Sequence, residues 1–103
     1  MSIEISPNAS KYVGVFGEDN WVEAANVTIS TATFEVFDSD GESVQGSASA
    51  TIADNGTPTP DIYGLVDGSN LTLGQRYEVA FLITVGSEIY EIKRHVYCQE
   101  TSV

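Results

Sequence analysis

Two runs of alternating apolar and polar residues, joined by Gly86-Ser87, fill residues 77–98 and constrain the fold more than any other part of the chain. Successive side chains of a strand point to opposite faces, so this alternation predicts a β-hairpin. With Gly86-Ser87 as a two-residue turn, Val85 pairs with Glu88, and the register of the whole hairpin follows. One face is then nearly all apolar and needs a second layer to cover it; it carries Tyr77, Val79, Phe81, Ile83, Tyr90, Ile92, Arg94 and Val96.

The opposite face of this hairpin is polar and carries charges of both signs. Its cross-strand pairs are Glu78 with His95, Ala80 with Lys93, and Leu82 with Glu91. Such a pattern is typical of a face that meets solvent or a partner. Arg94 stands on the apolar face opposite Val79, where its charge must reach solvent, an aromatic ring or a carboxylate. It either extends past the end of the sheet to solvent or anchors a neighbouring subunit. The predicted partner-binding residues are Glu78, Glu91, Lys93, Arg94 and His95.

The rest of the chain also has the pattern of short strands. Turn signals recur about every 8 to 12 residues, and no long stretch has a helical period, which together indicate an all-β fold. We expect an Ig-like β-sandwich of about seven antiparallel strands. Residues 1–103 would form a single domain with short flexible termini. The expected strand regions outside the closing hairpin are Lys11–Phe16, Trp21–Ser30, the hairpin arms within Ala32–Val44, Ser47–Ala53 and Ile62–Val66.

Local patterns refine this expectation. Asp40-Gly41 fits a two-residue type I′ turn, which would pair Phe37 with Val44. Residues 57–61 contain two prolines and are expected to form a loop or an edge crossing, because proline lacks the backbone donor of a strand ladder. The predicted core consists of Val13, Val15, Trp21, Val27, Ile29, Phe34, Val36, Ile52, Tyr63, Leu65, Leu71, Tyr77, Val79, Phe81, Ile83, Tyr90, Ile92 and Val96.

The charge of the chain excludes several classes of partner. The net charge is −11, from 15 acidic and 4 basic residues. Nucleic acid and anionic membranes are therefore not expected as partners, because both require clustered basic residues. No apolar run approaches the roughly 20 residues that span a bilayer. The first residues lack the basic and apolar regions of a signal peptide, so we expect Met1 to begin a protein that is not exported.

The chemistry-bearing residues do not form a recognisable catalytic or metal-binding motif. Cys98 is the only cysteine, which excludes an internal disulfide and a cysteine-rich zinc site. No helix end or second histidine would lower its pKa, so we expect a buried or edge thiol. His95 is the only histidine, and its pairing with Glu78 is expected to be a solvated cross-strand pair rather than an acid–base couple. We therefore expect no enzyme activity, no catalytic residue, no cofactor and no metal.

Two motifs leave a calcium site and a peptide-binding contact as alternatives. Asp38, Asp40 and Glu42 lie beside a glycine and could offer oxygen ligands to calcium, although Asp40-Gly41 is already explained as a turn. The chain ends in the form Thr-x-apolar at residues 101–103, which a PDZ-type groove would capture by strand addition.

Residues 32–98 resemble the small immunoglobulin-like virion proteins of tailed bacteriophages and the amino-terminal sandwich of phage baseplate proteins. The resemblance rests on an aromatic Asp-Gly hairpin, a later leucine–glycine–tyrosine run and the closing strands. The matching residues are Phe34, Val36, Phe37, Asp38, Asp40 and Gly41, then Leu71, Gly74, Tyr77, Val79 and Phe81, then Val85, Gly86, Tyr90 and Glu91.

This resemblance implies a structural role without catalysis. The protein would be a head, neck or tail component, made in the host cytoplasm and located in the virion. Its partners would be other virion proteins or further copies of itself. The alternative is a soluble adhesion or ligand-binding module that recognises a carbohydrate or a peptide through a surface such as residues 55–61.

Overall fold

The computed structural model describes residues 3–15, 29–53 and 60–99. These residues form an all-β fold, as the sequence predicts, with one short 3-10 helix, η2 (Gly68–Asn70). No helix of the described residues is long and apolar enough to cross a membrane. The strands are β1 (Ile3–Ile5), β2 (Ser10–Val15), β3 (Ile29–Asp38), β4 (Ser43–Ser49), β5 (Thr51–Ala53), β6 (Asp61–Asp67), β7 (Arg76–Val85) and β8 (Glu88–Cys98).

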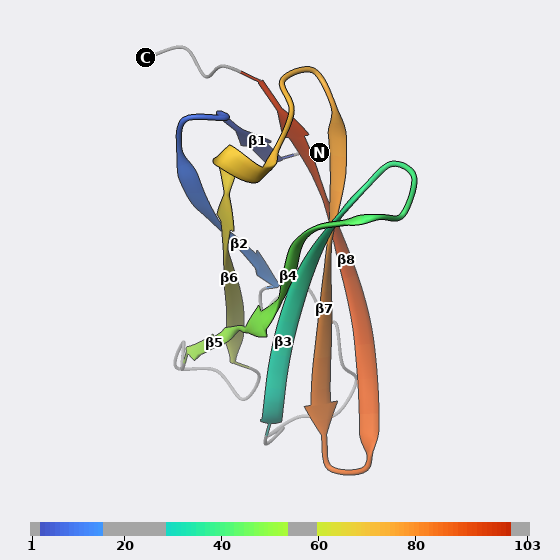
Figure 1. Cartoon of the computed structure of the whole chain (residues 1–103). Helices are drawn as coiled ribbons and strands as arrows, with labels where there is room; N and C mark the ends of the chain where they lie inside the picture. The colour runs from blue at the N-terminus through green and yellow to red at the C-terminus, as the bar shows by residue number, and fades with distance from the viewer. Residues whose placement is uncertain (1–2, 16–28, 54–59, 100–103) are drawn as a thin grey trace.

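The strands form two sheets that pack against each other (Figure 1). The larger sheet has the order β1-β8-β7-β3-β4, and the smaller one has the order β2-β6-β5. Neighbouring strands are antiparallel except β1, which runs parallel to the end of β8. The sequence pattern does not indicate β1, since its three residues are too few to show a period.

The closing hairpin has the register that its sequence predicts. Val85 pairs with Glu88, and the pairing continues without a shift to Arg76 and Tyr97. Gly86 has φ +62° in the turn, a conformation that glycine adopts without steric cost. Because this register contains no bulge, the apolar face turns inward along the whole length of β7 and β8.

The core lies between the inner faces of the two sheets. Most of the predicted core residues within the described ranges are buried: Val13, Val15, Phe34, Val36, Leu71, Tyr77, Val79, Phe81, Ile83 and Val96. Ile29, Tyr90 and Ile92 are half-buried and pack against this core. Trp21 and Val27 lie outside the described residues. The core also contains residues outside the predicted set: Ile5, Ala32, Ile62, Val66 and Cys98.

The predicted orientation of β6 is wrong. Ile62 and Val66 face the core, whereas Leu65 is 42% exposed and Tyr63 is half-buried on the outer face. The physical reason is Gly64, since a Cβ there would lie 2.6 Å from Cγ of Phe34. The ring of Phe34 therefore packs on bare backbone of the opposite sheet, and this contact decides which face of β6 turns inward.

The predicted turn at Asp40-Gly41 is also wrong by one residue. Phe37 pairs with Ser43 rather than with Val44, so the loop has three residues instead of two. Gly41 takes φ +83°, as in a type I turn that ends in a left-handed residue. One carboxylate oxygen of Asp38 accepts hydrogen bonds from the N–H groups of Asp40 and Glu42, each at 2.9 Å, and this holds the longer loop.

The predicted strand Ser47–Ala53 is divided between the two sheets. β4 ends at Ser49 in the larger sheet, and β5 begins at Thr51 in the smaller one. The register shifts between β3 and β4 lie earlier in β4, between Ser43 and Ala48, and the chain leaves the larger sheet after Ser49. Ile52 lies at the edge of the smaller sheet and is 42% exposed, so its prediction as a core residue is wrong.

Candidate functional site

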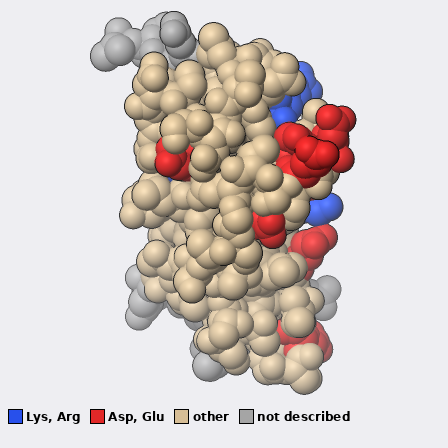
Figure 2. Space-filling model, viewed as in Figure 1, with Lys and Arg blue, Asp and Glu red and all other residues tan. Residues whose placement is uncertain are grey.

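The candidate site is a groove on the outer face of the larger sheet, where the turn between β3 and β4 stands beside β7 and β8. Its volume is about 510 Å³. Figure 2 shows acidic and basic side chains gathered along this side of the molecule, beside a broad face with few charges. The residues that line this outer groove are Phe37, Asp38, Ser39, Gly41, Arg76, Tyr77, Glu78, Ala80, Glu91, Lys93 and His95.

The strand register explains why these side chains meet. β7 lies between β3 and β8, so each row across the sheet takes one residue from each strand. One row runs from His95 through Glu78 to Phe37. The next row on the same face contains Lys93, Ala80 and Glu35. The small side chain of Ala80 leaves space between its longer neighbours, and this space is the floor of the outer groove.

Lys93 is the electrostatic centre of the outer groove. Its Nζ lies 3.4 Å from Oε1 of Glu78 and 3.8 Å from Oε1 of Glu91. The side chain of Lys93 is 49% exposed, and ion pairs in such positions contribute about 0–1 kcal/mol because water screens them. A charged group of a ligand can therefore replace Glu78 or Glu91 as the partner of Lys93 at little cost in free energy.

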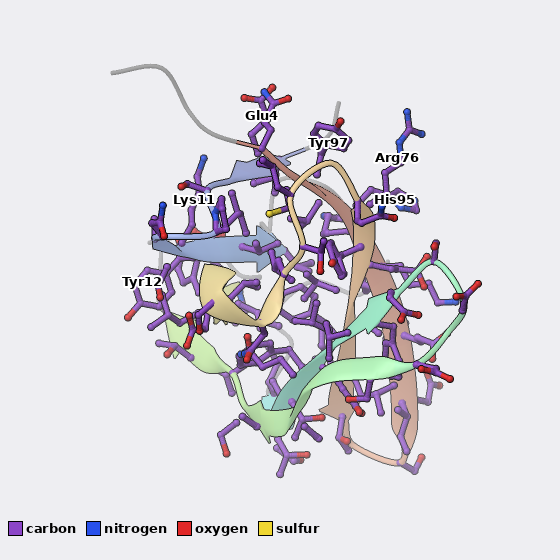
Figure 3. The ribbon with its side chains drawn as sticks, turned by 45° about the horizontal axis from the view of Figure 1, so that its top comes forward. Glu4, Lys11, Tyr12, Arg76, His95 and Tyr97 are labelled. Carbon is purple, nitrogen blue, oxygen red and sulfur yellow. The ribbon has the colours of Figure 1, made fainter. Side chains whose placement is uncertain are left out.

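Arg76 is the charged residue of the outer groove that the sequence pattern did not single out. It stands opposite Tyr97, one step beyond the predicted pair of Tyr77 and Val96. Arg76, His95 and Tyr97 project from the same region of the β7–β8 pair (Figure 3). Extending the register by one residue would have placed Arg76 on the polar face.

The five predicted partner-binding residues are not all brought together. Glu78, Glu91, Lys93 and His95 line the outer groove. Arg94 lies on the inner face opposite Val79, is half-buried, and donates from Nη1 to the carbonyl oxygen of Lys93 at 3.2 Å. Arg94 therefore does not join the other four in one contact surface.

Among the acidic residues of the β3–β4 turn, Asp38 holds the turn through its own carboxylate. Asp38 caps two N–H groups of its own loop, and the carbonyl oxygen of Asp38 accepts from the N–H of Gly41 at 3.1 Å. Among the described residues, no group of three or more His, Cys, Asp and Glu side chains is arranged to hold a metal ion.

A second surface lies on the outer face of the smaller sheet. Tyr12 is 62% exposed, and its ring packs edge-on against Tyr63 with centroids 6.4 Å apart. These two rings, together with Thr51 and Ala53, line a hollow of about 340 Å³. The hydroxyl of Tyr63 donates to Oδ2 of Asp61 at 3.2 Å; burial, this hydrogen bond and the carboxylate charge together raise the pKa of Tyr63.

Two further sequence features are the lone thiol of Cys98 and the C-terminal residues. Cys98 is buried between β1 and the core, as expected for its lone thiol, and burial raises the pKa of the thiol. Residues 101–103, which could bind a PDZ-type groove, lie outside the described residues, as do residues 55–59.

Comparisons of the chain with family models, curated proteins and solved structures find no match.

Proposed function

We propose that this protein is a non-catalytic structural subunit of a tailed-bacteriophage virion and that it assembles through protein–protein contacts at the outer groove. The observation that carries the proposal is the position of the basic side chains. The whole chain has 4 lysines and arginines and a net charge of −11, yet Arg76, Lys93 and the only histidine line this one groove. Basic groups interspersed with Glu78 and Glu91 suit a polypeptide segment that carries both charges, because such a pattern selects a partner and its register.

Within this proposal the fold is an Ig-like sandwich. The orders β8-β7-β3-β4 and β2-β6-β5 correspond to the G-F-C-C′ and B-E-D orders of immunoglobulin-type sheets. The hydroxyl of Tyr77, near the start of β7, accepts a hydrogen bond from the N–H of Thr72 at 2.6 Å. This contact has the form of the tyrosine corner of immunoglobulin-type domains.

The test is incorporation into virions that lack this protein. Purified protein is mixed with particles grown from a phage genome in which its gene is deleted, and bound protein is measured after sedimentation. We expect the native protein to join the particles and Arg76→Glu or Lys93→Glu to join at least tenfold less, since each replaces an attractive charge by a repulsive one. Lys11→Glu is the matched control, because Lys11 lies on β2 in the other sheet (Figure 3) and is absent from the lining of the groove.

Two results would contradict the proposal. Native protein that never joins any particle would exclude the virion role. Equal loss with Lys11→Glu and Arg76→Glu would show that net charge, rather than the outer groove, controls the contact. Folding of each variant is checked by circular dichroism and thermal unfolding.

A ligand-binding module is the second candidate, and the surface of Tyr12 and Tyr63 favours it. Exposed aromatic rings beside hydroxyl and carboxylate groups can stack on a sugar and bond to its hydroxyls. Titration with cello- and malto-oligosaccharides, followed by tyrosine fluorescence, tests this candidate. Binding that is lost in Tyr12→Ala and kept in Arg76→Glu would favour it over the assembly role.

A further inference from the structure

The outer face of the larger sheet has an apolar half and a hollow half. Side chains reach this face from alternate residues of β3, β7 and β8, in rows that follow the strand register. Leu82 is 44% exposed and Ile89 is 69% exposed, and both lie in the half near the β7–β8 turn. The outer groove occupies the other half, with Ala80 in its floor. β1 pairs with the edge of β8, so it leaves this face uncovered.

An exposed apolar side chain and a hollow on the same face allow two copies to fit each other. In a two-fold contact both copies use the same patch, so a projecting side chain of one copy must meet a hollow of the other. This happens when the two outer faces lie against each other about an axis that crosses the strands midway between Ala80 and Leu82. Leu82 of each copy then faces Ala80 of the other, at the floor of the outer groove. Ile89 faces His95 in the same arrangement.

The charges on β8 are complementary across this axis. Lys93 pairs with Ala80, and Glu91 pairs with Leu82. Because the axis lies midway between these two pairs, Lys93 of one copy faces Glu91 of the other, and the axis repeats the contact. Nζ of Lys93 also lies 3.8 Å from Oε1 of Glu91 within each chain, so the four side chains form a ring of alternating charge.

Other two-fold axes on this face bring like charges together. Moving the axis along the strands by one residue, in either direction, places Lys93 or Glu91 against its own copy. An axis that runs along β7 places Glu78 against its own copy, whereas the axis across the strands places Glu78 opposite the neutral Thr84. Like charges that face each other in a contact are unfavourable, so the charges select one arrangement.

The β3–β4 turn stands beyond the facing strand of the second copy. The turn follows Asp38, which pairs with Tyr77 of β7. The axis places the row of Tyr77 opposite the row of Val85, where Ile29 begins β3 of the second copy. The turn therefore lies past the first residue of that strand, and the rows of the two sheets between these points can approach each other.

We propose that the protein forms a homodimer in which the outer faces of the two larger sheets pack together, with Leu82 of each copy in the outer groove of the other and Lys93 paired with Glu91. This inference names a second copy as the partner of the outer groove, and it rests on the assembly role proposed for that groove. Sheets that pack face to face lie about 10 Å apart. The contact spans parts of three strands, a small area for a stable dimer, so we expect a dissociation constant in the micromolar range.

Charge reversal tests this arrangement without depending on the fold of a single variant. Lys93→Glu and Glu91→Lys should each dimerise at least about tenfold more weakly than the native protein, because two attractive pairs become repulsive. An equimolar mixture of the two variants should associate again, since each altered side chain then meets the opposite charge in the other copy. Glu4→Lys is the matched control; Glu4 lies on β1, outside the contact, and this variant should dimerise like the native protein. Sedimentation equilibrium over a dilution series from about 1 mM measures each sample.

A matched pair of leucines tests the apolar part of the contact. Leu82 and Leu65 are 44% and 42% exposed, but Leu65 lies on β6 in the smaller sheet. Leu82→Ser removes most of the apolar side chain from both halves of the contact, so it should dimerise at least about tenfold more weakly than the native protein. Leu65→Ser makes the same change on the other sheet and should dimerise like the native protein.

The outcomes separate this dimer from the proposed virion role. A protein that stays monomeric over the whole dilution series overturns the inference, and so does a dimer that the mixture of Lys93→Glu and Glu91→Lys fails to restore. Dimerisation of Leu82→Ser at native strength overturns it as well. A monomer that still joins particles through the outer groove would leave the virion role intact. A dimer restored by mixing, from a protein that joins no particle, would support this pairing and exclude the virion role.

Discussion

The contact between Gly64 and Phe34 makes a quantitative prediction about the packing of the two sheets. A Cβ on Gly64 would lie 2.6, 2.7 and 2.8 Å from Cγ, Cδ2 and Cδ1 of the ring, well inside the 3.5–4.0 Å of a favourable carbon contact. In Gly64→Ala the ring must therefore move by about 1 Å. Phe34 is only 5% exposed and packs on the fully buried Phe81, with centroids 6.1 Å apart, so little space is available.

The expected loss of stability follows from two opposing terms. Overpacking of a core costs about 1–3 kcal/mol, while replacing glycine by alanine at a compatible backbone conformation gives back about 0.4–1 kcal/mol through the unfolded chain. Gly64→Ala should therefore lower the free energy of unfolding by about 1–2 kcal/mol. For a domain of this size that change lowers Tm by roughly 5–15 °C.

A double-mutant cycle with Phe34→Leu tests the cause of this loss. Removing the ring gives the new methyl group space, so Gly64→Ala should cost less in that background, by a coupling of about 1–2 kcal/mol. Gly46→Ala is the matched control, because a Cβ at Gly46 meets nothing within 4 Å. Denaturant unfolding of the four proteins measures the cycle. An equal cost of Gly64→Ala in both backgrounds would refute the argument that the ring determines which face of β6 turns inward.

Three further predictions concern single side chains. Tyr77→Phe removes the oxygen that accepts from Thr72, and the lost bond should reduce the free energy of unfolding by about 1–2 kcal/mol in denaturant titration. The buried thiol of Cys98 should resist alkylation until the protein unfolds. Because burial raises the pKa of this thiol in the folded state, the thiol contributes to the free energy of unfolding below its ordinary pKa of 9.0. This contribution is lost as pH rises through the folded pKa. Alkylation at the same rate in native and unfolded protein would contradict this. Ser69 lowers the pKa of Asp67 through hydrogen bonds from its N–H at 2.9 Å and its hydroxyl at 2.8 Å. This carboxylate therefore contributes to the free energy of unfolding above pH 3.8, and the contribution is lost as pH falls through the pKa of Asp67 in the folded protein. Asp67→Asn should show a smaller drop in Tm on acidification, and an unchanged drop would exclude this contribution.

The parts of the fold that could be predicted are those governed by local pattern. One two-residue turn determines every pair of the β7–β8 hairpin, and all of them have the predicted register. The alternation of the two strands is therefore sufficient to place the side chains of Glu78, Lys93 and His95 on one face.

The parts that could not be predicted depend on contacts distant in sequence. Residues 62–66 carry apolar side chains in both alternating sets, so only the contact of Gly64 with Phe34 decides between the two faces. The outer groove needs β3 beside β7, and the hairpin sequence alone contains no information about that neighbour. The turn at Asp40-Gly41 differs by one residue from its prediction because the carboxylate of Asp38 stabilises a longer loop.

The alternation that defines β8 also separates its structural and interaction roles. Its even-numbered residues bond toward β7 and turn their side chains to the inner face, so changes there act on stability. Its odd-numbered residues send side chains to the outer face and backbone groups to the edge away from β7, where β1 pairs with the end of β8. A side-chain change at Lys93 therefore alters the outer groove and leaves the inner face unchanged. Because such a change spares the inner face, the proposed contact at the outer groove can be tested in a folded protein.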